Sequence, residues 1–208
     1  MAGNAIRCVG KYLYDNGIVP KETMTIETPG GIRELKLYIM NSAVSSVEVN
    51  MGKASLRPED VPVKLDGDSI LSRRVNIVGG EYDITCVSVG NPHCVVFCDR
   101  VDNVDVAKLG PMFENAGIFP EGVNTEFVRL VNKNTLKMRV WERGNGETAA
   151  CGTGACAAVI AAVENGYCNK GEDITVKLKG GDLIVNYSDD AVLLTGSTAL
   201  IYEGVIQY

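Results

Sequence analysis

A cysteine lies among glycines and other small residues in the stretch 141–162, which reads WERGNGETAACGTGACAAVIAA. The alanine-rich part predicts a helix, so Cys151 stands at or just before the helix N-terminus. Unpaired N–H donors and the positive end of the helix dipole gather at that position. Both lower the pKa of a thiol, and the same donors bind anions such as a carboxylate. The pattern favours a thiol base beside a carboxylate site, as removal of a hydrogen from the α-carbon of an amino acid would require.

A plain packing role is the alternative for any cysteine among small apolar residues. Glycines on both sides of Cys151 let a ligand approach the backbone closely. Glu142 and Arg143, just upstream, add charges that a zwitterionic ligand can use. Cys156 is surrounded by alanine and is the better candidate for the core.

The composition indicates a globular protein of one large domain or two small ones, with 208 residues, 46% hydrophobic residues and a net charge of −6. No apolar run is long enough to span a membrane, and we identify no secretory leader. The seven cysteines form no C-x-x-C pattern. Cys94 and Cys98 share one face of a predicted strand, so we expect no metal site there. Free thiols indicate the cytoplasm, and the acidic charge argues against nucleic-acid binding.

Four segments of the first half of the chain recur in the same order in the second half. The pairs are 2–17 with 151–166, 25–31 with 175–181, Tyr38 with Tyr187, and 47–56 with 192–200. Ala2 thereby falls on Cys151, and both helices end at an Asn-Gly stop signal. The order of the segments indicates a duplication. We therefore expect an α+β fold of two pseudo-symmetric lobes, each a curved, mostly antiparallel sheet around a central helix.

The repeat also predicts the domain organisation. The first lobe covers residues 1–75, and residues 200–208 are expected to form a strand that can return to it; the second lobe covers residues 76–199. The second copy has a front half, residues 83–150, before its helix, whereas only Met1 precedes the first helix. We therefore expect the first lobe to be incomplete, with about 65–70 residues missing upstream.

A turn between two predicted strands carries further polar side chains. Strands are expected over 82–89 and 94–98, and Gly90-Asn91-Pro92-His93 joins them. Ligand contacts gather in strand-end turns, so Asn91 is a candidate, although an Asn-Pro turn without a ligand is equally typical. The one histidine, His93, is expected to make structural hydrogen bonds rather than to act as a base.

The remaining segments are predicted from turn and helix signals. Residues 57–81 form a connector with one or two strands. A helix covers 104–117, with Asp102 or Asn103 as its cap and a potential break at Gly110-Pro111.

Several motifs together resemble the diaminopimelate epimerase family, and the resemblance covers essentially the whole chain. The motifs are GNAIRC at 3–8, GNPH at 90–93, PEGVN at 120–124, ERG at 142–144 and ACGTG at 150–154. The resemblance implies a cofactor-independent isomerase of lysine and peptidoglycan precursor synthesis. It would interconvert LL- and meso-diaminopimelate by proton transfer between two cysteines on opposite sides of the α-carbon. It also implies the two-lobed fold of a superfamily that includes proline racemase.

The same resemblance implies the site residues. Cys151 would be one base, and substrate would be bound by Gly3, Asn4, Asn91, Asn124, Glu142, Arg143, Gly152 and Thr153. The family has a cysteine where this chain has Ala2, and a methyl group cannot transfer a proton. We therefore expect this chain to be impaired or limited to half of the reaction. No cofactor and no metal are implied, and the expected partner is the amino-acid substrate alone, without nucleic acid or membrane; a homodimer is left open.

Two other functions compete with this one. The first is a racemase or isomerase of the same superfamily with another substrate, but Glu142-Arg143 stands where proline racemases are expected to carry an Asp-x-Ser-Pro-Cys pattern. The second is a non-catalytic binding or assembly module, which Ala2 favours.

Overall fold

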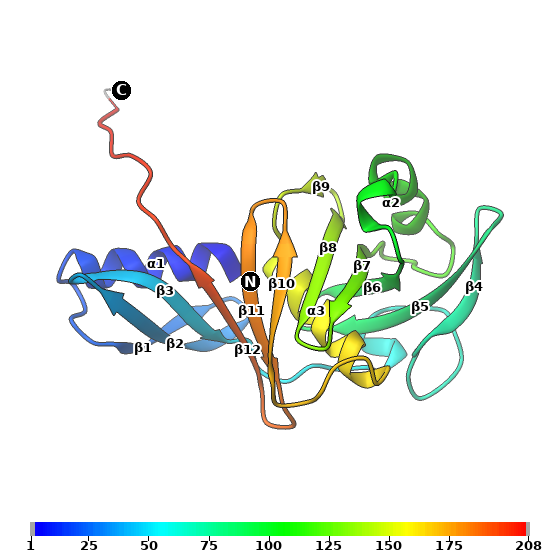
Figure 1. The fold of residues 1–208 in the computed structure, drawn as a ribbon, viewed down its shortest axis with the longest axis horizontal. Helices are drawn as coiled ribbons and strands as arrows, with labels where there is room; N and C mark the ends of the chain where they lie inside the picture. The colour runs from blue at the N-terminus through cyan, green and yellow to red at the C-terminus, as the bar shows by residue number, and fades with distance from the viewer. Residues whose placement is uncertain (1–2, 207–208) are drawn as a thin grey trace.

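The computed structural model describes residues 3–206, which form one extended sheet with a few helices (Figure 1). The α-helices are α1 (Gly3–Asp15), α2 (Val106–Glu114) and α3 (Gly152–Glu164), and the 3₁₀ helices are η1 (Pro58–Asp60) and η2 (Val101–Asn103). The strands are β1 (Thr23–Thr28), β2 (Gly31–Met40), β3 (Ala43–Asn50), β4 (Arg73–Ile77), β5 (Gly80–Ser88), β6 (Pro92–Phe97), β7 (Asn124–Asn132), β8 (Thr135–Glu142), β9 (Gly146–Thr148), β10 (Asp173–Leu178), β11 (Gly181–Tyr187) and β12 (Val192–Ser197). In this part of the chain, no helix has the length and apolarity to cross a membrane.

Neighbouring strands of the sheet are mostly antiparallel. The strand order is β1-β2-β3-β12-β11-β10-β8-β7-β6-β5-β4, and β9 pairs with β8 beside this path. Only the pairs β6–β7 and β8–β10 are parallel among the described strands. A largely antiparallel sheet with few helices is an α+β fold, which confirms the predicted fold class.

The repeated module is visible in the order of elements. α1 is followed by β1, β2 and β3, and α3 by β10, β11 and β12. In each copy a Gly-Gly turn joins the first two strands, and its second glycine, Gly31 or Gly181, has a positive φ of 96° or 127°. The last strands of the two copies, β3 and β12, pair antiparallel with each other. One sheet therefore runs through both copies, and the domain boundary at residue 75 stays a prediction.

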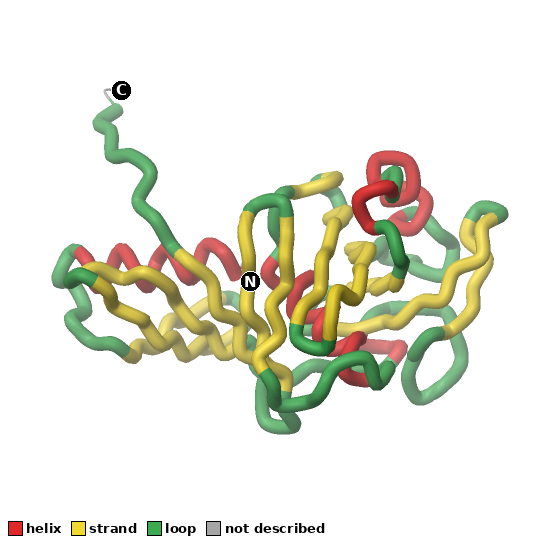
Figure 2. The backbone as a smooth tube through the Cα atoms, in the orientation of Figure 1, coloured by secondary structure: helices red, strands yellow, loops and turns green. Residues whose placement is uncertain are grey.

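The two repeated helices differ in how completely the sheet covers them. Eleven of the thirteen residues of α3 are buried. The strands that pack around it are β5, β6, β7, β8, β10, β11 and β12. Its alanine side chains let strands approach on several sides. α1 packs one face on β2 and β3 (Figure 2). Its other face is open, with Val9 43% and Tyr12 60% exposed.

The first turns of α1 and α3 touch at glycines. A Cβ atom on Gly152 would lie 3.6 Å from the Cα of Gly3 and 3.0 Å from a methyl carbon of Leu194 on β12. A Cβ on Gly3 would likewise lie 3.0 Å from Leu194. Glycine at both positions lets the two helix starts meet, and this contact positions the residues around them.

The opposite face of β5–β8 carries a second core under α2. Phe113 of α2 packs edge-to-face on Phe127 of β7, with ring centroids 5.7 Å apart. Cys86 and Cys94 are buried in this core, and Cys98 packs against it. The shared face of Cys94 and Cys98 was predicted from strand alternation. The described residues contain no group of His, Cys, Asp or Glu side chains suited to a metal ion.

The structure of α2 differs from the prediction at two points, the residue that caps the helix and the effect of its proline. Residues 101–103 form η2, so neither Asp102 nor Asn103 is the cap; Asp105 takes that role and accepts a hydrogen bond from the Lys108 N–H at 3.1 Å. Gly110-Pro111 lies inside α2 and does not end it. Gly110 is required there because it packs on the ring of Trp141.

The strand expected over residues 200–208 is wrong for the part that the structure describes. Residues 200–206 form no strand and lead away from β12 past α1, with Ile201 83% exposed (Figure 1). Both edges of β3 are already paired, with β2 and β12, so no backbone edge of that strand is free for them. Residues 207–208 lie outside the described part.

Replacing Gly110 with alanine is expected to destabilise the fold by about 1–3 kcal/mol through overpacking. The added Cβ would lie 2.2 Å from the indole ring of Trp141, which is held by a hydrogen bond from its Nε1 to Glu114 at 2.6 Å. Urea unfolding measures the change. Gly117→Ala is the control, because nothing lies within 4 Å of its Cβ position; equal stability of the two variants would contradict the packing argument.

Candidate active site

A cleft of about 400 Å³ lies where the N-termini of α1 and α3 meet. It is lined by Gly3, Asn4, Asn91, Glu142, Ala150, Cys151, Gly152 and Thr153. The structure therefore brings seven of the nine sequence-predicted site residues into one cleft. A larger hollow of about 680 Å³ lies over β1 and β2, but neither a cysteine nor a helix N-terminus lines it.

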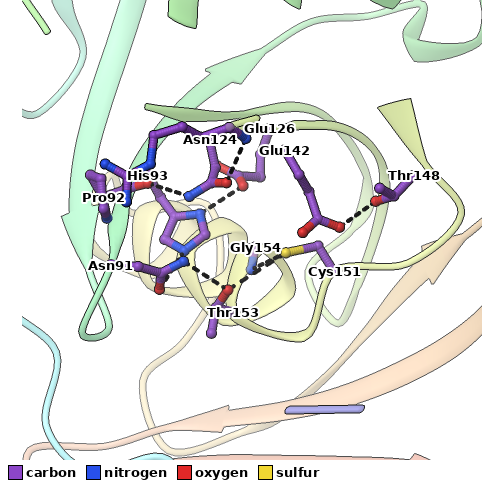
Figure 3. Close-up of polar contacts among 11 residues, drawn as sticks. Asn91, Pro92, His93, Asn124, Glu126, Glu142, Thr148, Cys151, Thr153 and Gly154 are labelled. Atoms are coloured by element: carbon purple, nitrogen blue, oxygen red, sulfur yellow. Dashed lines mark hydrogen bonds and ion pairs between the residues drawn. The ribbon is translucent and has the colours of Figure 1, made fainter. Parts of the chain in front are cut away.

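Cys151 is the N-cap residue of α3, as the sequence predicts. Its backbone is extended, with φ −128° and ψ 113°. Its Sγ accepts a hydrogen bond from the Gly154 N–H at 3.4 Å and lies 3.5 Å from the Thr153 hydroxyl oxygen (Figure 3). The Gly154 N–H therefore donates to the sulfur from the first turn of the helix, and the Thr153 hydroxyl lies beside the sulfur.

The pKa of Cys151 moves in the direction opposite to the prediction. Burial raises the pKa of this thiol to about 12, and the carboxylates of Glu126 and Glu142 add to the rise. The hydrogen bonds from Thr153 and from the Gly154 N–H oppose it. The prediction of a lowered pKa considered only the helix terminus and not the loss of water. Cys151 is therefore a thiol at neutral pH while the cleft holds no positively charged ligand.

A buried arginine holds the cleft side of α1. Arg7 is 6% exposed. Its guanidinium donates hydrogen bonds at 3.1 Å to the Gly3 carbonyl oxygen and to Asn4 Oδ1. These bonds fix the Asn4 side chain in the cleft wall. Arg7 is not among the residues predicted for the site; its spacing of three and four residues from Asn4 and Gly3 is the sequence signal for this contact.

A buried histidine–glutamate pair lies behind the cleft. His93 Nδ1 lies 2.7 Å from Glu126 Oε1, and His93 Nε2 lies 3.1 Å from Asn91 Oδ1. Asn91 Nδ2 in turn donates to the Thr153 hydroxyl oxygen at 3.3 Å. Parallel pairing of β6 with β7 brings His93 and Glu126 together. His93 makes structural hydrogen bonds, as expected; Glu126 was missed, because only strand pairing shows what it contacts.

Asn124 and Arg143 are absent from the residues that line the cleft. Asn124 donates to the Pro92 carbonyl oxygen at 2.7 Å and accepts from the Arg143 N–H at 3.0 Å. The Arg143 guanidinium donates to the Glu121 carbonyl oxygen at 2.9 Å. Here the Asn124 amide therefore joins the first residue of β6 to the residue that follows β8. Direct substrate contact by these two residues stays a prediction.

Glu142 lies at the end of β8 on the wall of the cleft. Its carboxylate accepts a hydrogen bond from the Thr148 hydroxyl of β9. β9 pairs with β8 at this point, with Glu142 opposite Gly146. The short β8–β9 hairpin thus fixes one carboxylate on the side of the cleft that also carries Cys151.

Solved structures with the same fold come from amino-acid epimerases and phenazine biosynthesis. A hydroxyproline epimerase from Agrobacterium vitis, with bound trans-4-hydroxy-L-proline, has a TM-score of 0.67 at 16% identity, over 95% of this chain and 63% of that one. A phenazine biosynthesis protein from Bacillus anthracis has a TM-score of 0.63 at 14% identity, over 94% and 72%. The chain therefore shares its fold with these proteins, as the resemblance implied.

Sequence comparison then gives the family. The family model of diaminopimelate epimerase matches residues 1–57 and 85–201. Diaminopimelate epimerases from Acetivibrio thermocellus and Methanococcus maripaludis are each 46% identical over 208 residues, which is 99% of this chain and 74% of those proteins. One from Desulfovibrio desulfuricans is 43% identical over 212 residues. The chain belongs to the diaminopimelate epimerase family, and the function predicted from the sequence is confirmed at that level.

Proposed function

We propose that the cleft binds diaminopimelate and that Cys151 exchanges a proton with its α-carbon. The observation that carries the proposal is the thiol at the N-cap of α3, inside a cleft formed by two helix N-termini. A base that works in general acid–base catalysis must reach the proton that it moves. The positive ammonium group of the substrate would favour the thiolate over the thiol, against the effect of burial.

The two helix starts are the proposed site for the α-carboxylate. The first N–H groups of a helix have no partner within the helix, and they favour an anion. Gly3 and Asn4 supply them from α1, and Gly152 and Thr153 from α3. As negative charge develops on the substrate after proton removal, the same donors would stabilise it.

The remaining proposed roles concern the rest of the substrate. Glu142 would hold the amino group at the reacting carbon, and Arg143 the distal end. Asn91 and Asn124 would also bind substrate. Metal and cofactor have no part in this proposal.

We propose that this chain carries out only half of the reaction, namely proton exchange without inversion. Ala2 lies outside the described residues, and by sequence it occupies the place of the second base. Cys151 alone can remove a proton and return one to the same side of the α-carbon. Inversion needs a donor on the other side, which a methyl group cannot provide.

Solvent exchange of the α-hydrogen tests this proposal. The protein is incubated in D2O with LL-diaminopimelate, meso-diaminopimelate or L-proline, and the α-hydrogen signal is followed by NMR. We expect exchange for a diaminopimelate isomer and none for proline. Exchange of proline alone would support another racemase of the same fold. Tight binding of diaminopimelate with no exchange would support a non-catalytic binding module.

Location and association complete the proposal. The seven cysteines are free thiols, which supports a reducing compartment such as the cytoplasm. A homodimer is the alternative to a single copy. Tyr12, 60% exposed, and Ile201, 83% exposed, are apolar surface that association would cover; sedimentation velocity decides between one copy and two.

A further inference from the structure

A continuous path of hydrogen bonds joins the buried carboxyl group of Glu126 to the sulfur of Cys151 (Figure 3). The path passes from Glu126 to His93, then through the Asn91 amide to the Thr153 hydroxyl. The two ends of the path also lie close together, on either side of Gly154. A Cβ atom on Gly154 would lie 2.7 Å from Glu126 Oε1 and 3.3 Å from Cys151 Sγ.

The direction of each bond follows from the Asn91 amide. Its Nδ2 donates to the Thr153 oxygen, so its Oδ1 faces His93 Nε2. An amide oxygen only accepts, and Nε2 must therefore carry a hydrogen. The Thr153 oxygen accepts from Asn91 and keeps its own hydrogen. A thiolate at Cys151 only accepts, so the Thr153 hydroxyl donates to the sulfur whenever Cys151 is ionised.

The other side of His93 then requires one shared proton. With a hydrogen on Nε2, two arrangements remain at Nδ1. Either Nδ1 accepts a hydrogen bond from a protonated Glu126, or Nδ1 carries a hydrogen and donates it to the Glu126 carboxylate. Both arrangements place one proton between two atoms 2.7 Å apart. In both, the net charge of the Glu126–His93 pair is zero.

Burial favours this neutral pair over a charged one. Both side chains are fully buried, and Glu126 Oε2 has no hydrogen-bond partner among the described residues. A carboxylate without a cation would be costly there. Burial raises the pKa of Glu126, and the partly compensating charge and hydrogen bond of His93 do not cancel the rise.

The titratable groups around the pair are acids. Glu142 of β8 and the Cys151 thiol of α3 lie on the cleft side of the pair. Cys94 of β6 lies on the other face of the sheet, beside Cys86 of β5. A negative charge on the pair would oppose a thiolate at Cys151. A neutral pair removes that opposition.

We propose that Glu126 is a positioning residue that shares one proton with His93. The sharing fixes the Nε2–H form of the imidazole and, through Asn91, holds the Thr153 hydroxyl beside the Cys151 sulfur, where it donates to the thiolate. The consequence for Cys151 rests on the proposed function, whereas the protonation state of His93 does not.

The first experiment is NMR of the imidazole nitrogens of His93 in the full chain labelled with ¹⁵N-histidine. His93 is the one histidine in the sequence, so the signals need no assignment. We expect a hydrogen on Nε2 at neutral pH, as its bond to the Asn91 amide oxygen requires. An Nδ1–H form with a bare Nε2 would overturn the proposal.

Two variants test the role of Glu126 in proton transfer. Glu126→Leu removes the partner of His93 Nδ1, and we expect mixed imidazole forms and α-hydrogen exchange slowed about tenfold, the value of one hydrogen bond. Glu126→Gln can donate to Nδ1, so it should retain the Nε2–H form and most of the exchange rate. Glu27→Leu, an exposed position on β1, is the matched control.

The outcomes separate the two proposals. Unchanged imidazole signals in Glu126→Leu would overturn the positioning role even if exchange slowed. If the parent chain shows no exchange, the proposed function fails, and the NMR of His93 still decides the protonation state. If Glu126→Leu does not fold, the imidazole signals of Glu126→Gln decide the positioning role, because loss of the Nε2–H form in that variant would overturn it.

Discussion

Replacing Cys151 with serine is expected to slow α-hydrogen exchange by about 10²–10⁴-fold, the usual contribution of a positioned acid–base group. A serine hydroxyl fits the same N-cap position and can accept from the Gly154 N–H. It does not ionise near neutral pH, so it cannot take the proton from the α-carbon. The rate of deuterium entry into diaminopimelate measures the effect.

The control for this variant is Cys8→Ser. Cys8 is exposed on α1 and lies away from the residues that line the cleft, so its exchange rate should match that of the parent chain. Thermal unfolding checks that both variants fold. A Cys151→Ser variant that folds and keeps a tenth or more of the parent rate would rule out Cys151 as the proton-transferring group.

Replacing Ala2 with cysteine is expected to convert exchange into inversion. The repeat aligns residue 2 with Cys151, and Gly3, the next residue, touches Gly152 at the start of α3. A thiol before α1 would supply a proton from the side of the α-carbon that Cys151 does not reach. We expect interconversion of LL- and meso-diaminopimelate to rise by about 10²-fold or more.

Chiral chromatography of the two isomers measures this gain. Ala2→Ser is the matched control, since it adds a polar group of similar size without an ionisable thiol. Continued exchange in the Ala2→Cys variant with no inversion would contradict the assignment of residue 2 as the second base position.

Local signals account for the parts of the fold that were predicted. The Asn-Gly pairs at 16–17 and 165–166 end α1 and α3, and the Gly-Gly pairs place the hairpins β1–β2 and β10–β11. These signals act over a few residues, so a sequence can display them. The internal duplication also predicted that α1 and α3 are equivalent helices. It could not show that β3 and β12 pair with each other, because that contact joins strands more than a hundred residues apart.

The site was predicted from residue type, and its missing parts depend on burial. Cys151, Asn91 and Glu142 stand beside glycines or turns and could be identified from the sequence. Glu126 and Arg7 lie within a strand and a helix, where the sequence does not show that a polar residue is buried; for Arg7 only its helical spacing from Gly3 and Asn4 indicates a contact. The pKa of Cys151 was predicted in the wrong direction for the same reason: the helix terminus is a local feature, whereas the burial that raises the pKa to about 12 is not.

The stereochemical fate of the substrate tests the central claim most directly, namely that Cys151 moves a proton on one side of the α-carbon only. The parent chain is incubated in D2O with each diaminopimelate isomer, and the recovered isomers are separated and analysed for deuterium. The account predicts deuterium at one stereocentre with its configuration retained. Inversion at the rate of exchange would mean that another residue supplies the second proton, and would contradict it.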